Sequence, residues 1–116
     1  MANTKVTLHF ANERLDRATY IAETVGFGEV VKSAEWINTN GEMVYEQILE
    51  SGVMVVLGSN RRIVTMYIMT EEDLFGRFLK NHWGKPPHWL VDKVRKNKKM
   101  GYTKNQPDHH KPLKKS

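Results

Sequence analysis

The sequence contains no cysteine and no long apolar run, and each absence removes a class of protein. Without cysteine, the chain forms neither disulfides nor thiolate metal sites. No stretch approaches the roughly 20 apolar residues of a membrane-spanning helix, and the opening residues lack the apolar core of a signal peptide. A Gly-rich phosphate loop and an internal repeat are also missing. We therefore expect a cytoplasmic protein that makes no membrane contact.

Basic residues are sparse before residue 80, and acidic residues are sparse after it. Residues 1–79 carry seven Lys or Arg against eleven Asp or Glu, a net charge of −4, whereas residues 80–116 carry eleven against two, a net charge of +9. An acidic body with a cationic C-terminal third suits an anionic partner such as nucleic acid. The same layout suits a solvated basic tail that aids solubility, so the charge pattern leaves both interpretations open.

The N-terminal elements are predicted from the spacing of apolar residues. Apolar and polar residues alternate over residues 4–10, which is the period of a half-buried strand. Over residues 12–25 the apolar residues recur at three- and four-residue steps, which predicts an amphipathic helix. The same spacing over residues 29–37 predicts a second, shorter helix, with Trp36 in the core.

Three strands are expected next, over residues 42–49, 53–57 and 63–69. Their linkers are too short for parallel crossovers, so the three strands should form an antiparallel meander. The middle segment, "VMVVL", is an unbroken apolar run typical of a strand that is buried on both faces.

Two helices close the predicted fold. Thr70 followed by three acidic residues is a typical helix N-cap, and it predicts a helix over residues 71–83. A basic C-terminal helix is expected at about 88–100, and Gly101 is placed to end it. The result is a single α+β domain over residues 1–101 in the order β-α-α-β-β-β-α-α, with the N-terminal helices on one face of an antiparallel sheet. Residues 102–116 are polar and charged, which predicts a disordered basic tail.

The final helix gives the clearest functional signal in the sequence. Leu90 and Val94 can anchor it to the body, while its cations face outward, where phosphate contacts would make nucleic-acid binding sensitive to salt. The candidate nucleic-acid-binding residues are Arg17, Arg62, Lys93, Arg95, Lys96, Lys98, Lys99 and Lys104.

Two tryptophans, Trp83 and Trp89, flank the start of this helix. Both can stack on bases beside Lys85 and Lys93, as aromatic residues do in single-strand binders. The alternative, which we favour, is that they pack the last two helices onto the sheet, with at most one of them partly exposed.

The order of elements and two short motifs resemble the RelE/ParE-like toxin superfamily, in its small phage or mobile-element form. The stretch "HFANERLDRA", residues 9–18, is similar to the opening of such proteins, and "RRIVTMYIM", residues 61–69, takes the place of the strand that closes their sheet. The resemblance covers residues 4–79. It implies an RNase-like fold that binds or cleaves RNA on its sheet face without a metal.

The resemblance also suggests which residues would carry metal-independent cleavage. That reaction needs a base, an acid and a cation that stabilises the charged transition state. His9, Arg14 and Arg61 are the candidate catalytic residues. The alternative is that His9 lies on a strand surface and that Arg14 and Arg17 pair locally with Glu13 and Asp16. Such toxins usually carry several cations across the sheet, and few occur here, so whether this protein is an enzyme stays open.

The four later histidines, His82, His88, His109 and His110, invite a metal site, but their spacing fits no standard ligand pattern. We therefore expect no metal site and no cofactor.

From the sequence we expect a small protein that binds nucleic acid through the basic C-terminal helix, with RNA favoured over DNA as the partner. The alternative is a non-enzymatic phage or mobile-element effector that binds and inhibits a host protein. Its contact surface would then be acidic, formed by Glu42, Glu46, Glu50 and residues 71–73. An antitoxin-like protein is a further candidate partner.

Overall fold

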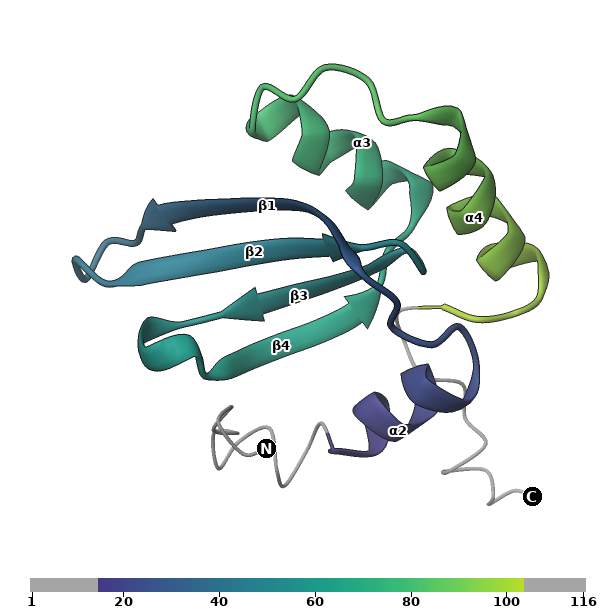
Figure 1. The fold of residues 1–116 in the computed structure, drawn as a ribbon, viewed down its shortest axis with the longest axis horizontal. Coiled ribbons are helices and arrows are strands. Elements are labelled where there is room, and N and C mark those ends of the chain that lie inside the picture. Colours follow the sequence, from purple (N-terminus) through teal and green to yellow (C-terminus); the bar gives the residue numbers. More distant parts are fainter. Residues whose placement is uncertain (1–14, 104–116) are drawn as a thin grey trace.

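A four-stranded antiparallel sheet with helices on both of its faces forms the described part of the protein (Figure 1). The computed structural model describes residues 15–103. Each strand pairs with the next one in sequence, so the α+β class and the antiparallel meander are confirmed. The elements are α2 (Leu15–Glu23), β1 (Val30–Ile37), β2 (Met43–Leu49), β3 (Val53–Leu57), the short 3-10 helix η1 (Ser59–Arg61), β4 (Ile63–Ile68), α3 (Glu71–Lys80) and α4 (His88–Lys99).

The predicted helix over residues 29–37 is wrong, because this segment forms β1 and pairs with β2. The register places Glu35 opposite Tyr45. A tight turn brings the two strands together: the Asn38 side chain accepts hydrogen bonds from the backbone N–H groups of Asn40 and Glu42 at 2.8 and 2.9 Å. A helix this short is marginal by itself, whereas pairing with β2 gives the segment backbone hydrogen bonds along the side that faces β2.

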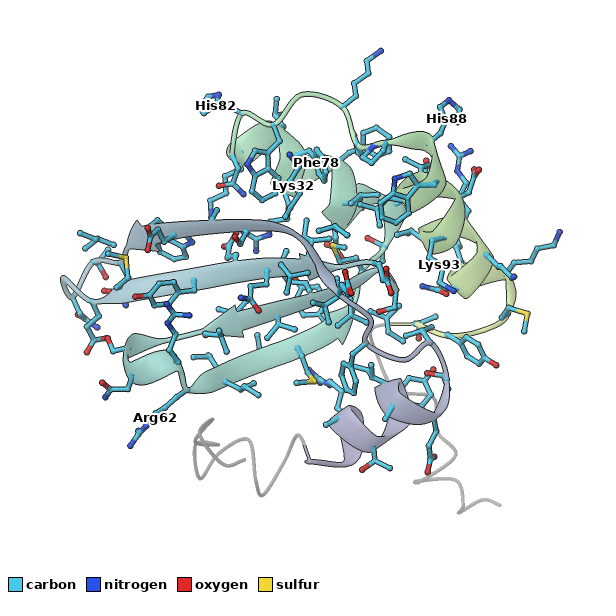
Figure 2. All side chains as sticks on the ribbon, in the orientation of Figure 1. Lys32, Arg62, Phe78, His82, His88 and Lys93 are labelled. Carbon is cyan, nitrogen blue, oxygen red and sulfur yellow. The ribbon has the colours of Figure 1, made fainter. Side chains whose placement is uncertain are left out.

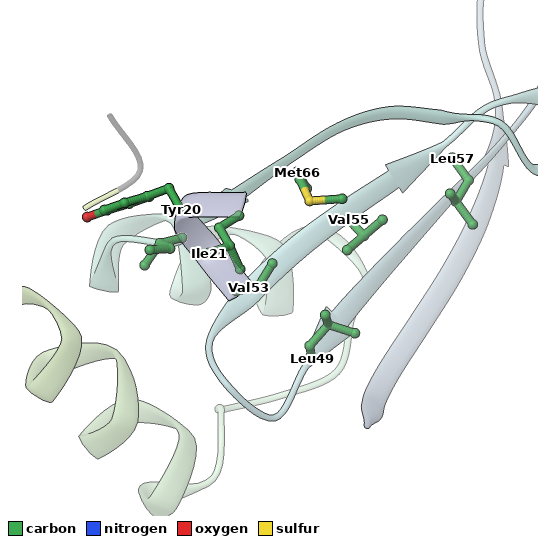
Figure 3. Packing of buried hydrophobic residues seen from close by; sticks show 8 residues of the cluster. Tyr20, Ile21, Leu49, Val53, Val55, Leu57 and Met66 are labelled. Carbon is green, nitrogen blue, oxygen red and sulfur yellow. The ribbon is translucent and has the colours of Figure 1, made fainter. Parts of the chain in front are cut away.

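Each face of the sheet buries its own hydrophobic cluster. On one face, Tyr20 and Ile21 of α2 pack against residues of β3 such as Val53 and Val55 (Figure 3). On the other face, α3 and α4 cover the alternate side chains, Met54 among them. Strand β3 is therefore buried on both faces, as its unbroken apolar sequence predicts.

Local signals in the sequence fix the ends of the two C-terminal helices. At the start of α3, Asp73 N–H donates to the Thr70 hydroxyl and Thr70 N–H donates to the Asp73 carboxylate, both at 3.0 Å, which is a capping box. Helix α4 ends where Gly101 adopts a φ of 88° and Tyr102 N–H donates to the Asn97 carbonyl at 2.8 Å. The predicted N-cap and stop are confirmed, although α3 ends at Lys80 rather than near residue 83.

The remaining predictions about the fold concern the ends of the chain. The strand expected over residues 4–10 and most of the predicted tail lie outside the described residues. Tyr102, within the predicted tail, packs against the cluster on the α2 side of the sheet. Among residues 15–103, no helix is long and apolar enough to cross a membrane.

Candidate nucleic-acid interface

Helix α4 is held firmly against the turn between β2 and β3. Its inner residues Leu90 and Val94 are almost fully buried. Asn97 is also buried, and its side-chain amide donates to the backbone carbonyl of Ser51 at 2.9 Å. A Cβ atom added to Gly52 would lie 3.0 Å from the Asn97 amide nitrogen, so helix and turn are in direct contact. These contacts fix which face of α4 points to solvent.

Three lysines follow one another along the outer side of α4. Lys93, Lys96 and Lys99, which we call the α4 lysine ridge, are spaced three residues apart and span about 9 Å of helix. Lys96 and Lys99 are exposed and Lys93 is half-buried. Within the described part of the chain, none of the three forms an ion pair. Their charges are therefore available to an external anion.

Arg95 differs from the ridge, because it is bound to a carboxylate of α3. Its Nε and Nη2 donate to the two carboxylate oxygens of Glu71 at 2.9 and 2.7 Å. The hydrogen bond from Arg95 lowers the pKa of Glu71 below its ordinary value, and the nearby charge of Lys98 adds to the effect. Arg95 thus ties α4 to α3. Lys98 lies near the same Glu71 carboxylate, so part of its charge is already balanced within the protein.

The other predicted nucleic-acid-binding cations do not join this surface. Arg17 donates from Nη1 to the Met66 carbonyl of β4 at 3.4 Å. Arg62 lies at the end of the sheet opposite α4, as its separation from Lys93 shows in Figure 2. Among the described residues, the predicted nucleic-acid-binding cations therefore lie in at least two separate parts of the surface. Lys104 lies outside the described residues.

The candidate catalytic residues are only partly described, because His9 and Arg14 lie outside residues 15–103. The Arg61 guanidinium lies over the Tyr45 ring, 4.4 Å from its centroid, in a backbone conformation with a φ of 60°. The two side chains line a shallow pocket of about 240 Å³ on the sheet, together with Ser33, Ala34, Glu35 and Gln47. This pocket contains a cation, a phenol and a carboxylate, at the end of the sheet away from α4.

Glu46, which the sequence predicts to lie on an exposed acidic contact surface, is buried. Only 2% of its surface is exposed, and its Oε2 accepts hydrogen bonds from Arg77 Nη1 at 2.8 Å, Trp36 Nε1 at 3.0 Å and Lys80 Nζ at 3.4 Å. The Lys80 ammonium also lies 4.5 Å from the Trp36 ring centroid. Glu46 is therefore a structural tie between β2, β1 and α3, and it is not part of an acidic contact surface. Trp36, predicted to be in the core, is 36% exposed on β1.

The two tryptophans near the start of α4 have different environments. Trp83 packs edge-on against Phe78, with 5.2 Å between ring centroids, and it anchors the connection between α3 and α4. Trp89 is 50% exposed. It lines an open pocket of about 420 Å³ with Lys93, Glu50, Ser51 and the loop of residues 25–28.

The described part of the chain contains no group of three His, Asp or Glu residues that could hold a metal ion. His82 and His88 lie near the ends of the connection between α3 and α4, and Figure 2 shows both at the periphery of the molecule. Comparison of the chain with protein-family models, with curated proteins and with solved structures finds no match.

Proposed function

We propose that this is a cytoplasmic nucleic-acid-binding protein that contacts RNA through α4. The observation that supports this proposal is the α4 lysine ridge, three cations on one rigid helix with no ion pair in the described part of the chain. A protein with no anionic partner gains little from keeping these charges together, because neighbouring like charges repel. Phosphate groups along a nucleic-acid strand would neutralise them and release counterions.

The acidic body determines which side of the protein attracts a polyanion. Residues 1–79 carry a net charge of −4, so a polyanion is repelled there and attracted to the C-terminal third. Asp92 is the one carboxylate on α4, and it is exposed beside the ridge rather than paired with it. We therefore expect a single phosphate-binding side, centred on α4.

RNA cleavage remains a separate hypothesis. Arg61 and its neighbours Tyr45 and Glu35 offer groups that can act on a phosphodiester, but Arg61 is next to Arg62, which lies at the other end of the sheet from α4 (Figure 2). A strand bound to the α4 lysine ridge would have to run along the sheet to reach them. The resemblance to RelE/ParE-like toxins, and any enzymatic activity, stay predictions that a cleavage assay must decide.

The alternative of a host-protein effector loses much of the surface assigned to it. Glu46 is buried and bound to three donors, and Glu71 is bound to Arg95. Of the acidic residues assigned to that surface, Glu42, Glu50 and Glu72 stay exposed, the first two at opposite ends of β2 and the third on α3. We therefore place the alternative second.

The test is a titration of labelled single-stranded RNA, duplex RNA and single-stranded DNA, followed by fluorescence anisotropy between 50 and 200 mM salt. If each lysine of the ridge neutralises one phosphate, these three contribute about −2 to the slope of log K against log salt for a single strand. The variant Lys96→Ala/Lys99→Ala should reduce the magnitude of the slope by about 1.4. Truncation before α4 is a poor substitute, because it would expose the core around Leu90.

Arg62→Glu is the matched control, because it lowers the net charge by the same two units at the opposite end of the sheet. It should change the affinity and the slope far less than the α4 variant. The proposal fails if no nucleic acid binds with a salt-dependent affinity, or if the control weakens binding as much as Lys96→Ala/Lys99→Ala.

A further inference from the structure

We propose that the open pocket beside Trp89 takes one unpaired nucleobase, so that the strand bound by α4 is single-stranded RNA. The inference rests on the proposed function and adds a base-binding site to its phosphate contacts. The pocket lies between the first turns of α4 and the loop of residues 25–28, with Glu50 at its edge. Phosphate contacts alone would accept a duplex, whereas an occupied base pocket requires a base that has left its stack.

Trp89 is the stacking surface. Its indole is half-exposed, and within the described part of the chain it packs against no other aromatic ring. Lys93 lies four residues further on, so its ammonium is on the same side of α4, one turn from the ring. An exposed aromatic ring beside a cation is the combination that single-strand binders use for a base and its neighbouring phosphate.

The opposite wall of the pocket is already rigid. The Ser51 hydroxyl donates to the Phe27 carbonyl at 2.8 Å, and Phe27 packs against the cluster under α2. The Glu50 N–H donates to the Glu29 carbonyl at 2.8 Å. Gly28 has a φ of +75°, and a Cβ atom at this position would overlap the Glu50 side chain. A preformed wall means that little conformational freedom is lost when a base enters.

The charges around the pocket decide how a nucleotide would be oriented. Glu50 is a hydrogen-bond acceptor, so it favours a base edge that carries N–H donors. Guanine presents two adjacent donors on its Watson–Crick edge and uracil presents one, so we expect guanine to bind more tightly than uracil. Glu29 and Glu50 repel phosphates, which leaves the backbone on the Lys93 side, where it continues along the α4 lysine ridge.

The experiment measures binding of guanine-containing and uridine-only RNA hexamers, and of an RNA duplex, by fluorescence anisotropy. Trp89→Ala should weaken binding of the guanine-containing hexamer by about 5- to 150-fold, the usual effect of removing one stacking partner. It should leave duplex binding unchanged. Trp89→Phe keeps an aromatic ring and should retain most of the affinity. Glu50→Gln should reduce the preference for guanine over uridine.

Intrinsic fluorescence gives a second measurement that does not depend on a label. Stacking of a base on Trp89 should quench the indole emission of the unlabelled protein, and Trp89→Phe should lose that part of the quenching while Trp36 and Trp83 still emit. Circular dichroism spectra of each variant check that the fold is kept, which the exposure of Trp89 leads us to expect.

The outcomes separate this inference from the proposed function. If Lys96→Ala/Lys99→Ala weakens RNA binding but Trp89→Ala does not, or weakens hexamer and duplex equally, the base pocket is refuted and the phosphate surface stands. If Trp89→Phe loses as much affinity as Trp89→Ala, stacking is refuted as the source of the effect. If no RNA of any kind binds, the proposed function itself is wrong and the inference falls with it.

Discussion

Replacing Arg77 by methionine tests whether the buried carboxylate of Glu46 depends on its cation. Glu46 is 2% exposed, and Arg77, itself 27% exposed, provides the shortest of its hydrogen bonds, at 2.8 Å. In Arg77→Met the carboxylate keeps Lys80 at 3.4 Å and the Trp36 N–H at 3.0 Å, and methionine replaces most of the lost apolar contact. The variant therefore leaves a buried charge with weaker compensation.

Removing one partner of a fully buried ion pair costs about 3–5 kcal/mol. Arg77 is partly exposed and Lys80 can move closer, so we expect a smaller loss of about 2–3 kcal/mol in the free energy of unfolding at neutral pH. At ~4 °C per kcal/mol for a domain of this size, the melting temperature should fall by about 10 °C. Urea unfolding followed by circular dichroism measures the loss directly.

Two further variants make the result specific. Arg62→Met removes an exposed arginine and should change the free energy of unfolding by less than about 0.5 kcal/mol. Glu46→Gln/Arg77→Met removes the buried charge together with its cation, and it should be more stable than Arg77→Met alone. The reasoning is refuted if Arg77→Met is as stable as Arg62→Met, or if adding Glu46→Gln lowers the stability further.

Two predictions concern pH and catalysis. Because the folded-state pKa of Glu71 lies below its ordinary value of 4.5, its ion pair with Arg95 contributes stability above that value and loses it as the pH falls through the folded-state pKa. Acid unfolding of Glu71→Gln should therefore show a weaker dependence on pH below about 4.5 than the parent protein, and identical profiles would show that the pair contributes nothing. If the protein cleaves RNA, His9→Ala and Arg61→Ala should abolish product formation on a gel while binding is kept. Cleavage by His9→Ala at the parental rate would show that His9 is not the base.

The meander could be predicted from the sequence because its signals are local. Residues 42–69 contain three β-rich runs separated by short turns, and no helix of normal length fits between the turns. The segment of β1 could not be assigned in this way. Its apolar residues fit a helical spacing, and the segment becomes a strand because it pairs with β2 along its whole length, from Val30 opposite Leu49 to Ile37 opposite Met43.

The cationic character of the candidate site could be predicted from the amino-acid composition of α4. The run of lysines in α4 shows a cationic helix, and the apolar positions show which side is buried. The sequence does not show that Arg95 is bound to Glu71, 24 residues earlier, because that contact exists only after α3 and α4 pack together. Trp83 and Trp89 are alike in the sequence, and only the position of Phe78 makes one an anchor and leaves the other half-exposed.

The end of α4 connects the two hydrophobic clusters of the protein. Leu90 and Val94 belong to the cluster under α3 and α4, whereas Tyr102, directly after the helix stop, packs against the cluster under α2. The helix therefore cannot detach without disturbing both faces of the sheet, and its unfolding should be coupled to that of the whole domain. Any ligand that binds α4 in the folded state then stabilises the entire domain by mass action. RNA bound to α4 would in this way also stabilise β3 against unfolding, although β3 contributes no residue to the α4 lysine ridge or to the pocket beside Trp89.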